Sequence, residues 1–206
     1  MRKLLASLAI TMGAVGAAHA DLAADADAAA GREKAQVCAA CHGQQGISAS
    51  PAFPHLAGQQ ASYLAKQIMD IRDGDRVVAQ MAGIVDDFSD QDAWDVAAYY
   101  ADQDANLGQA DPDEMLVERG RELYRAGDAA KGIPACSACH TPTGVGIGTA
   151  VYPALSGQIA DYTVSTLQAF AAGERTNDPA NIMGDIASKM SDEDMEAVAN
   201  YVLGLH

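Results

Sequence analysis

The 206-residue chain has few basic side chains, 13 Lys and Arg against 28 Asp and Glu, and its formal net charge is −15. Proteins that bind nucleic acid neutralise its phosphates with Lys and Arg, so this acidic balance excludes nucleic acid as a partner. The alternation of apolar and polar residues that indicates β-strands is also missing. After residue 20, no apolar stretch is long enough to cross a membrane. The sequence therefore predicts an all-α protein with no membrane-spanning segment after residue 20.

Cysteine is scarce as well, and all four cysteines belong to two copies of one motif. Residues 38–42 read Cys-Ala-Ala-Cys-His, and residues 136–140 read Cys-Ser-Ala-Cys-His. Cys-x-x-Cys-His is the attachment motif of c-type haem. Residues i and i+3 lie on one face of a helix, so both thiols of a motif can reach the two vinyl groups of one porphyrin, while the histidine binds the iron. We therefore predict two covalently bound haem c groups, attached through Cys38, Cys41, Cys136 and Cys139, with His42 and His140 as proximal iron ligands.

Two other interpretations of the cysteine pairs fit the sequence less well. A four-cysteine zinc site usually has its two pairs separated by fewer than about 20 residues, whereas Cys41 and Cys136 are 95 positions apart. A redox-active disulfide would not require a histidine directly after the second cysteine in both copies. Haem attachment is therefore the favoured interpretation.

The first twenty residues have the pattern of a secretory signal peptide. Basic residues at positions 2 and 3 precede an apolar run from Leu4 to Val15, and Ala18-His19-Ala20 provides a cleavage site. We expect cleavage after Ala20 and a mature protein in the periplasm, at the periplasmic face of the inner membrane but not spanning it. Retention of residues 1–20 as an anchor is the alternative. Export agrees with the haem motifs, because bacteria attach c-type haem after export.

The mature sequence is an internal repeat. Residues 31–33 (Gly-Arg-Glu) recur at 120–122, the haem motifs recur at an offset of 98, and residues 53–59 match 152–158. Further along, Met81, Ser89 and Tyr99 recur as Met183, Ser191 and Tyr201. We predict two tandem domains, residues 21–105 and 114–206, joined by a linker at 106–113, each a few short helices wrapped around one haem. Nine inserted residues between Glu122 and Cys136 leave the local fold there unpredicted.

Helix signals recur in the same places in both domains. In the first domain, helices are expected from about residue 28 to 38, from 59 to 72 with Gly74 as C-cap, and from Ser89 through Tyr99. The Ser89 hydroxyl can accept from free amides at the start of its helix, and Ser191 can do so in the second domain. Residues 21–30 are expected to be a loose lead-in.

These motifs resemble class I cytochromes c, and two such domains after a signal peptide resemble the dihaem cytochrome c4 family. The resemblance implies electron transfer towards terminal oxidases in the bacterial periplasm, and two domains related by a pseudo-twofold axis with their haem propionates near each other. It further implies that the carbonyls of Pro54 and Pro153 accept hydrogen bonds from the proximal imidazoles. Gly31 and Gly120 would lie where the first helix of each domain crosses the last.

The second axial ligand of each iron is expected to be a methionine, because a thioether is a soft ligand that stabilises ferrous iron and raises the reduction potential relative to a second histidine. Met81 and Met183 each precede a serine cap by eight residues, and this symmetry selects them. Met190 aligns with Phe88 and Met69 with Gln168, and Met195 falls on the apolar face of the last helix. His55 has only Ala154 as its counterpart, so it is a weak candidate.

Several further residues recur without a single interpretation. Arg76 and Arg175 could bind haem propionates as bidentate donors, or could be exposed surface arginines. Tyr63 and Tyr162 could contact a propionate or the haem edge, or could belong to the core. The glycines of the segment 144–148 have no strand before them and no phosphate-binding lysine after them, so they do not indicate a nucleotide site. We expect them to lie against a haem face.

The function predicted is that of a non-enzymatic electron carrier with two His/Met-ligated haems, which work as one relay between domains. The expected partners are redox proteins, a bc1-type donor complex and a terminal oxidase such as a cbb3 type. A dihaem subunit of a dehydrogenase or reductase complex is one alternative. A dihaem peroxidase-like enzyme is another, although it would need an iron with a vacant position.

Overall fold

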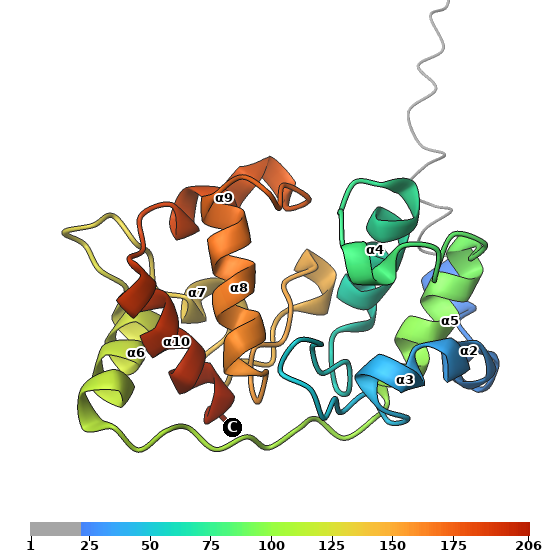
Figure 1. Ribbon diagram of the computed structural model, residues 1–206, viewed down its shortest axis with the longest axis horizontal. Coiled ribbons are helices and arrows are strands. Elements are labelled where there is room, and N and C mark those ends of the chain that lie inside the picture. The colour runs from blue at the N-terminus through green and yellow to red at the C-terminus, as the bar shows by residue number, and fades with distance from the viewer. Residues whose placement is uncertain (1–21) are drawn as a thin grey trace, which may run out of the picture.

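The structure, a computed structural model, describes residues 22–206 and consists of two helical halves side by side (Figure 1). The N-terminal half contains α2 (Ala28–Lys34), α3 (Ala39–His42), α4 (Ala61–Asp73) and α5 (Asp90–Ala101). The C-terminal half contains α6 (Glu114–Ala126), α7 (Ser137–His140), α8 (Ala160–Ala171), α9 (Ile182–Ala187) and α10 (Asp192–Leu203). Short 3₁₀ turns are formed by Ala35–Val37, Ala79–Met81, Gly148–Ala150 and Pro179–Asn181. The predicted signal peptide lies outside the described residues.

The all-α prediction is confirmed, because residues 22–206 contain isolated β-bridges but no strand. None of the helices in this part of the chain combines the length and the apolar character needed to cross a bilayer. The helix starts follow from local chemistry. The hydroxyls of Ser89 and Ser191 accept from the amides of Asp92 and Asp194, and these carboxylates accept from the serine amides in return. Such reciprocal capping boxes satisfy free donors at a helix start.

The lead-in before α2 is ordered, so the expectation of a loose segment is wrong. The Asp27 carboxylate accepts from the amides of Ala29 and Ala30 and so caps α2. The Asp27 amide itself donates to a carboxylate oxygen of Asp95 on α5, at 2.9 Å. The segment is therefore held on the last helix of its own half.

Each half is organised by a crossing of its first and last long helices, α2 with α5 and α6 with α10. Glycine occupies the point of closest approach in both. A Cβ atom on Gly31 would lie 1.9 Å from the carbonyl oxygen of Asp95, and one on Gly120 would lie 2.1 Å from that of Ala197. Only a residue without a side chain allows the backbones to come this close. The predicted role of the two glycines is confirmed.

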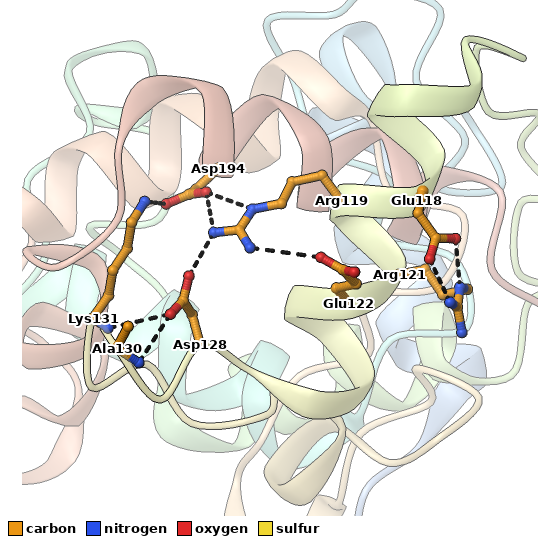
Figure 2. Close-up of polar contacts among 8 residues, drawn as sticks. All are labelled: Glu118, Arg119, Arg121, Glu122, Asp128, Ala130, Lys131 and Asp194. Carbon is orange, nitrogen blue, oxygen red and sulfur yellow. Dashed lines mark hydrogen bonds and ion pairs between the residues drawn. The ribbon is translucent and has the colours of Figure 1, made fainter.

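The nine inserted residues form a closed loop after α6. Backbone hydrogen bonds of 2.8 and 2.9 Å join Asp128 and Ile133 across it. Lys131 of the loop and Arg119 of α6 both reach the carboxylate of Asp194, at 2.5 and 2.7 Å, as Figure 2 shows. Arg119 also pairs with Asp128 at 2.8 Å. One buried carboxylate therefore ties the inserted loop to both long helices of the C-terminal half.

The chain between α5 and α6 runs extended beneath both halves in Figure 1. It is fastened to the C-terminal half at two places. The Asn106 side-chain amide donates to the carbonyl of Gly157 at 3.0 Å. The backbone N–H of Asp111 donates to the side-chain oxygen of Asn200 at 2.7 Å, and the side-chain nitrogen of Asn200 donates to the backbone carbonyl of Asp111 at 3.1 Å. This connection is therefore part of the packed structure.

Candidate haem-binding sites

The two histidines of the motifs are held in the same way. His42 lies at the end of α3 and His140 at the end of α7, and both are buried. Their Nδ1 atoms lie 3.0 Å from the carbonyl oxygen of Pro54 and 2.9 Å from that of Pro153. A carbonyl only accepts, so Nδ1 carries the proton in each ring. The lone pair on Nε2 is therefore free for a metal.

Burial also lowers the pKa of both imidazoles below the ordinary value, against the smaller opposing effect of the proline carbonyls. Both rings are neutral at physiological pH as a result, which is the form that binds a metal ion. The predicted contact between each imidazole and a proline carbonyl is present in both halves.

The four cysteines form no disulfide with one another. Within each motif the second cysteine lies on the short helix and the first directly precedes it, so both stand next to the histidine. Burial raises the pKa of Cys38, and it raises that of Cys136 to about 11. Residues 22–206 contain no group of three or more His, Cys, Asp or Glu placed to hold a metal ion by themselves. The two motifs therefore form two separate sites, one in each half.

A cavity of about 360 Å³ extends from one motif to the other. Its lining is mostly apolar and comes from both halves, including Leu64 and Val96 on one side and Leu167 and Phe170 on the other. The buried hydroxyl of Tyr100 also lines it and has no partner among the described residues. A large planar apolar group with a few polar substituents fits such a space. The cavity is thus suited to one haem in each half, with the two close to the interface.

Three methionines line the cavity: Met81 at the end of a 3₁₀ turn, Met183 in α9, and Met190. The first two are the predicted axial ligands, and both Met183 and Met190 also pack on the core of the C-terminal half. Met195 is 3% exposed and belongs to the same core, as its position on the helix indicated. His55 lines the cavity, but its Nδ1 accepts from the amide of Ser48 at 3.0 Å.

The two recurring arginines meet at the interface between the halves. Arg76 and Arg175 donate to the same side-chain oxygen of Gln67, each at 2.9 Å. Each also donates to a tyrosine of the other half: Arg76 to Tyr162 at 3.2 Å, and Arg175 to Tyr63 at 2.9 Å. Arg175 is only 9% exposed, so the surface alternative is wrong for it.

All four of these recurring side chains line the cavity. No carboxylate of residues 22–206 forms a salt bridge with Arg76 or Arg175. Burial would raise the pKa of Tyr162, but the two guanidinium charges outweigh it and the pKa lies below its ordinary value. The cavity therefore carries uncompensated positive charge where the halves meet, which suits carboxylate groups of a ligand.

Sequence reasoning missed three glutamines of the interface. Gln67 has only Thr166 as its counterpart, so no repeat signal pointed to it. Gln59 and Gln158 do recur at an offset of 99, and that repetition could have identified them. Each is buried and reaches into the other half: Gln59 contacts the backbone of Ala154, and Gln158 contacts that of His55.

The expectation for the glycines at 144–148 is wrong, because none of them lines the cavity. A Cβ atom on Gly146 would lie 2.4 Å from the carbonyl oxygen of Tyr152, and one on Gly148 would lie 2.7 Å from the side chain of Gln60. Close packing on neighbouring protein, in one case on the other half, therefore explains these glycines.

Comparison with known proteins agrees with this arrangement. Residues 117–206 match the family model described as cytochrome c, and residues 24–99 match the one described as cytochrome c oxidase, cbb3-type, subunit III. Cytochrome c4 of Pseudomonas aeruginosa is 51% identical over the whole of both chains. The crystal structure of reduced recombinant cytochrome c4 from Pseudomonas stutzeri superposes with a TM-score of 0.85 at 46% identity, covering 88% of this chain and 100% of that one.

A more distant relative is the thiosulfate dehydrogenase electron acceptor of Stutzerimonas stutzeri, 40% identical over 81% of this chain and 78% of the relative. Together with the two motifs and the shared cavity, these similarities identify the chain. It belongs to the cytochrome c4 family, electron-transfer proteins built from two cytochrome c domains with one covalently bound haem c in each.

Proposed function

We propose that the protein is a periplasmic electron carrier in which His42 and Met81 bind one haem iron and His140 and Met183 bind the other, with thioether links to Cys38, Cys41, Cys136 and Cys139. The observation that carries this proposal is the matched pair of buried imidazoles, each fixed by a proline carbonyl with Nε2 free. The position of both methionines on the same cavity supports it.

When bound, haem supplies a one-electron couple. His42 and Met81 would fill both axial positions of one iron, His140 and Met183 those of the other, and the apolar lining of the cavity would exclude water from both. A filled coordination shell favours electron transfer over binding of a substrate to the iron. The guanidinium groups of Arg76 and Arg175 would offer charge compensation to haem propionates reaching the interface.

The assignment of the methionines is tested by Met81→Ala and Met183→Ala. Each variant is expected to lose half of the thioether-to-iron charge-transfer absorbance and to lower the potential of one haem, because a soft thioether stabilises ferrous iron. Met69→Ala, on α4 outside the cavity, is the matched control. Met190→Ala is the competing test, since Met190 also lines the cavity. Loss of the band in Met190→Ala, with full intensity in Met183→Ala, would reassign the ligand.

The two haems are proposed to act as one relay. Hydrogen bonds link the halves at many points, including Gln60 to Val145 at 2.7 Å and Ser62 to Gly148 at 2.6 Å, in addition to the arginine contacts. The domains are therefore fixed next to each other, and an electron can enter at one and leave from the other. Cys136→Ala with Cys139→Ala, which removes the second attachment site, should change the first potential and slow transfer from donor to oxidase. An unchanged first potential together with full-rate transfer would contradict the relay.

The proposed partners are a bc1-type donor complex and a terminal oxidase such as a cbb3 type. The alternative of an electron-accepting subunit for one dehydrogenase is favoured by the thiosulfate dehydrogenase electron acceptor among the relatives. Size-exclusion chromatography of the native periplasmic extract separates the two: a free carrier elutes alone, and a subunit elutes with its enzyme. Rapid stoichiometric binding of carbon monoxide to the reduced protein would instead favour a peroxidase-like enzyme.

A further inference from the structure

The side-chain amides of Gln59 and Gln158 each form two hydrogen bonds with the backbone of the opposite half, one through the oxygen and one through the nitrogen. Gln158 accepts from the amide of His55 at 2.9 Å and donates to the carbonyl of His55 at 3.0 Å. Gln59 accepts from the amide of Ala154 at 2.7 Å and donates to its carbonyl at 2.9 Å. The two glutamines are 7% and 8% exposed, so water does not compete strongly for these contacts.

One of the two peptide groups that each glutamine contacts also accepts a hydrogen bond from a proximal histidine. The peptide bond between Pro54 and His55 has the Pro54 carbonyl at one end and the His55 N–H at the other. Its carbonyl accepts from Nδ1 of His42 at 3.0 Å, and its N–H donates to Gln158. One hydrogen-bonded chain therefore runs from a side chain of the C-terminal half, through one peptide group, to the imidazole of the N-terminal half.

The mirror arrangement is present in the other half. The carbonyl of Pro153 accepts from Nδ1 of His140 at 2.9 Å, and the N–H of the same peptide group, that of Ala154, donates to Gln59 at 2.7 Å. The side chain at position 55 differs from that at 154, histidine against alanine, yet the backbone contacts are the same. The arrangement thus depends on the glutamines and the peptide groups.

Hydrogen bonds in such a chain strengthen one another. A peptide group that donates through its N–H carries more negative charge on its carbonyl oxygen, so it accepts more strongly from the imidazole Nδ1–H. A stronger hydrogen bond at Nδ1 makes the imidazole a more basic ligand through Nε2. A more basic ligand stabilises ferric over ferrous iron and lowers the reduction potential.

We propose that Gln59 and Gln158 are crossed positioning residues, each tuning the proximal histidine of the opposite domain through the peptide group after Pro153 or Pro54. The proposal rests on the assignment of His42 and His140 as iron ligands under the proposed function. It makes the potential of each haem depend on a side chain from the other domain, without that side chain touching the haem ligand.

The test uses the holoprotein and the variants Gln158→Leu and Gln59→Leu, which keep most of the side-chain volume but make no hydrogen bond. Gln158→Leu is expected to raise the potential of the N-terminal haem and to shift the Nδ1–H resonance of His42 upfield, leaving the C-terminal haem unchanged. Gln59→Leu is expected to do the same to the C-terminal haem and His140. Redox titration followed by NMR assigns each shift to its domain.

A loosened interface would not produce this pattern, because each variant would then change the reduction potentials of both haems. Gln158→Glu is the conservative variant: its carboxyl oxygen still accepts from His55, so the N-terminal haem should stay at or below its original potential. Equal shifts of both haems, a shift only in the domain that carries the variant, or no shift at all would overturn the proposal. Failure of the proposed function is separately visible, as an unmodified protein whose spectrum lacks His/Met ligation.

Discussion

Arg175 in the C-terminal domain donates from Nη2 to the hydroxyl oxygen of Tyr63 in the N-terminal domain, at 2.9 Å. The same guanidinium lies 4.5 Å from the centroid of the Phe170 ring, a cation–π contact that fixes its plane. A buried cation is thus held where the two haem cavities join, with no salt bridge to a described carboxylate.

We therefore expect Arg175→Gln to lower the reduction potentials of the haems. Reduction adds negative charge, which a nearby cation stabilises. At a separation on the order of 10 Å and an effective dielectric constant of about 20, the interaction is roughly 1.7 kcal/mol, or about 70 mV for one electron. Potentiometry measures it. Arg121→Gln, an exposed arginine on α6 paired with Glu118, is the control, and equal potentials in the two variants would refute the prediction.

Asp194→Asn should destabilise the C-terminal domain by about 2 kcal/mol at pH 7, because Arg119 and Lys131 lose their shared partner. Denaturant unfolding followed by circular dichroism measures the loss. Asp185→Asn is the matched control, since Asp185 is exposed and pairs only with Lys189 across one helical turn. A cost below about 0.5 kcal/mol for both variants would show that the cluster of Figure 2 adds little.

The same carboxylate predicts a pH dependence of stability. Burial alone would raise the pKa of Asp194, but hydrogen bonds from Lys131 and Arg119 outweigh it and lower the pKa to about 2. A lowered pKa in the folded state stabilises the fold above the unfolded value of about 3.9, and this contribution is lost as the pH falls from there towards 2. The loss should be about 1–2 kcal/mol, allowing for the solvent around Lys131. Asp194→Asn should flatten the stability profile in this range; an equally steep profile would contradict the assignment.

The close approach of the helices at each crossing predicts that one added methyl group lowers the free energy of unfolding substantially. In Gly31→Ala the new Cβ would lie 1.9 Å from a backbone oxygen of α5, so α2 must move away, at about 3 kcal/mol or more. Gly83→Ala is the control: its φ is +79°, but nothing lies within 4 Å of its Cβ position. Backbone strain alone should cost about 1–2 kcal/mol there. Thermal unfolding of the two variants measures the difference, and equal losses would mean that the crossing tolerates a wider gap.

The acidic surface predicts electrostatic steering towards partners with basic patches. The part of the chain after residue 20 has a net charge of −17, divided almost evenly as −9 over residues 21–110 and −8 over 111–206. Raising the salt concentration from about 0.01 to 0.15 M shortens the Debye length from about 30 to 8 Å. The second-order rate with the oxidase should then fall about tenfold. Stopped-flow measurements test this, with an uncharged small-molecule reductant as control. A rate that does not change with salt concentration would contradict electrostatic steering and would mean that uncharged surface alone mediates docking.

The sequence predicted features that depend on neighbours in the chain or on the repeat. Ser89 and Ser191 form caps through residues three positions away, and Gly74 ends α4 in the left-handed conformation expected of a C-cap. Contacts between distant segments were harder to predict. Gln67 joins two arginines only because α4 faces the other domain, and its counterpart is a threonine, so neither periodicity nor repetition reveals it. The inserted loop has no counterpart at all, and it is anchored to the helices through Asp194, more than sixty positions away.

The exchange of Gln59 and Gln158 between domains has the form of an isologous contact, in which one surface patch meets a copy of itself. Between two identical chains, any mutation in such a patch would strike both sides at once. Within one chain the two sides are inherited separately, so each can change while its counterpart is kept. Positions 55 and 154 have diverged in this way, to histidine and alanine, while the hydrogen bonds from their backbone N–H groups to Gln158 and Gln59 are the same. In a fused chain, the surroundings of two haems that were identical after duplication can therefore evolve independently.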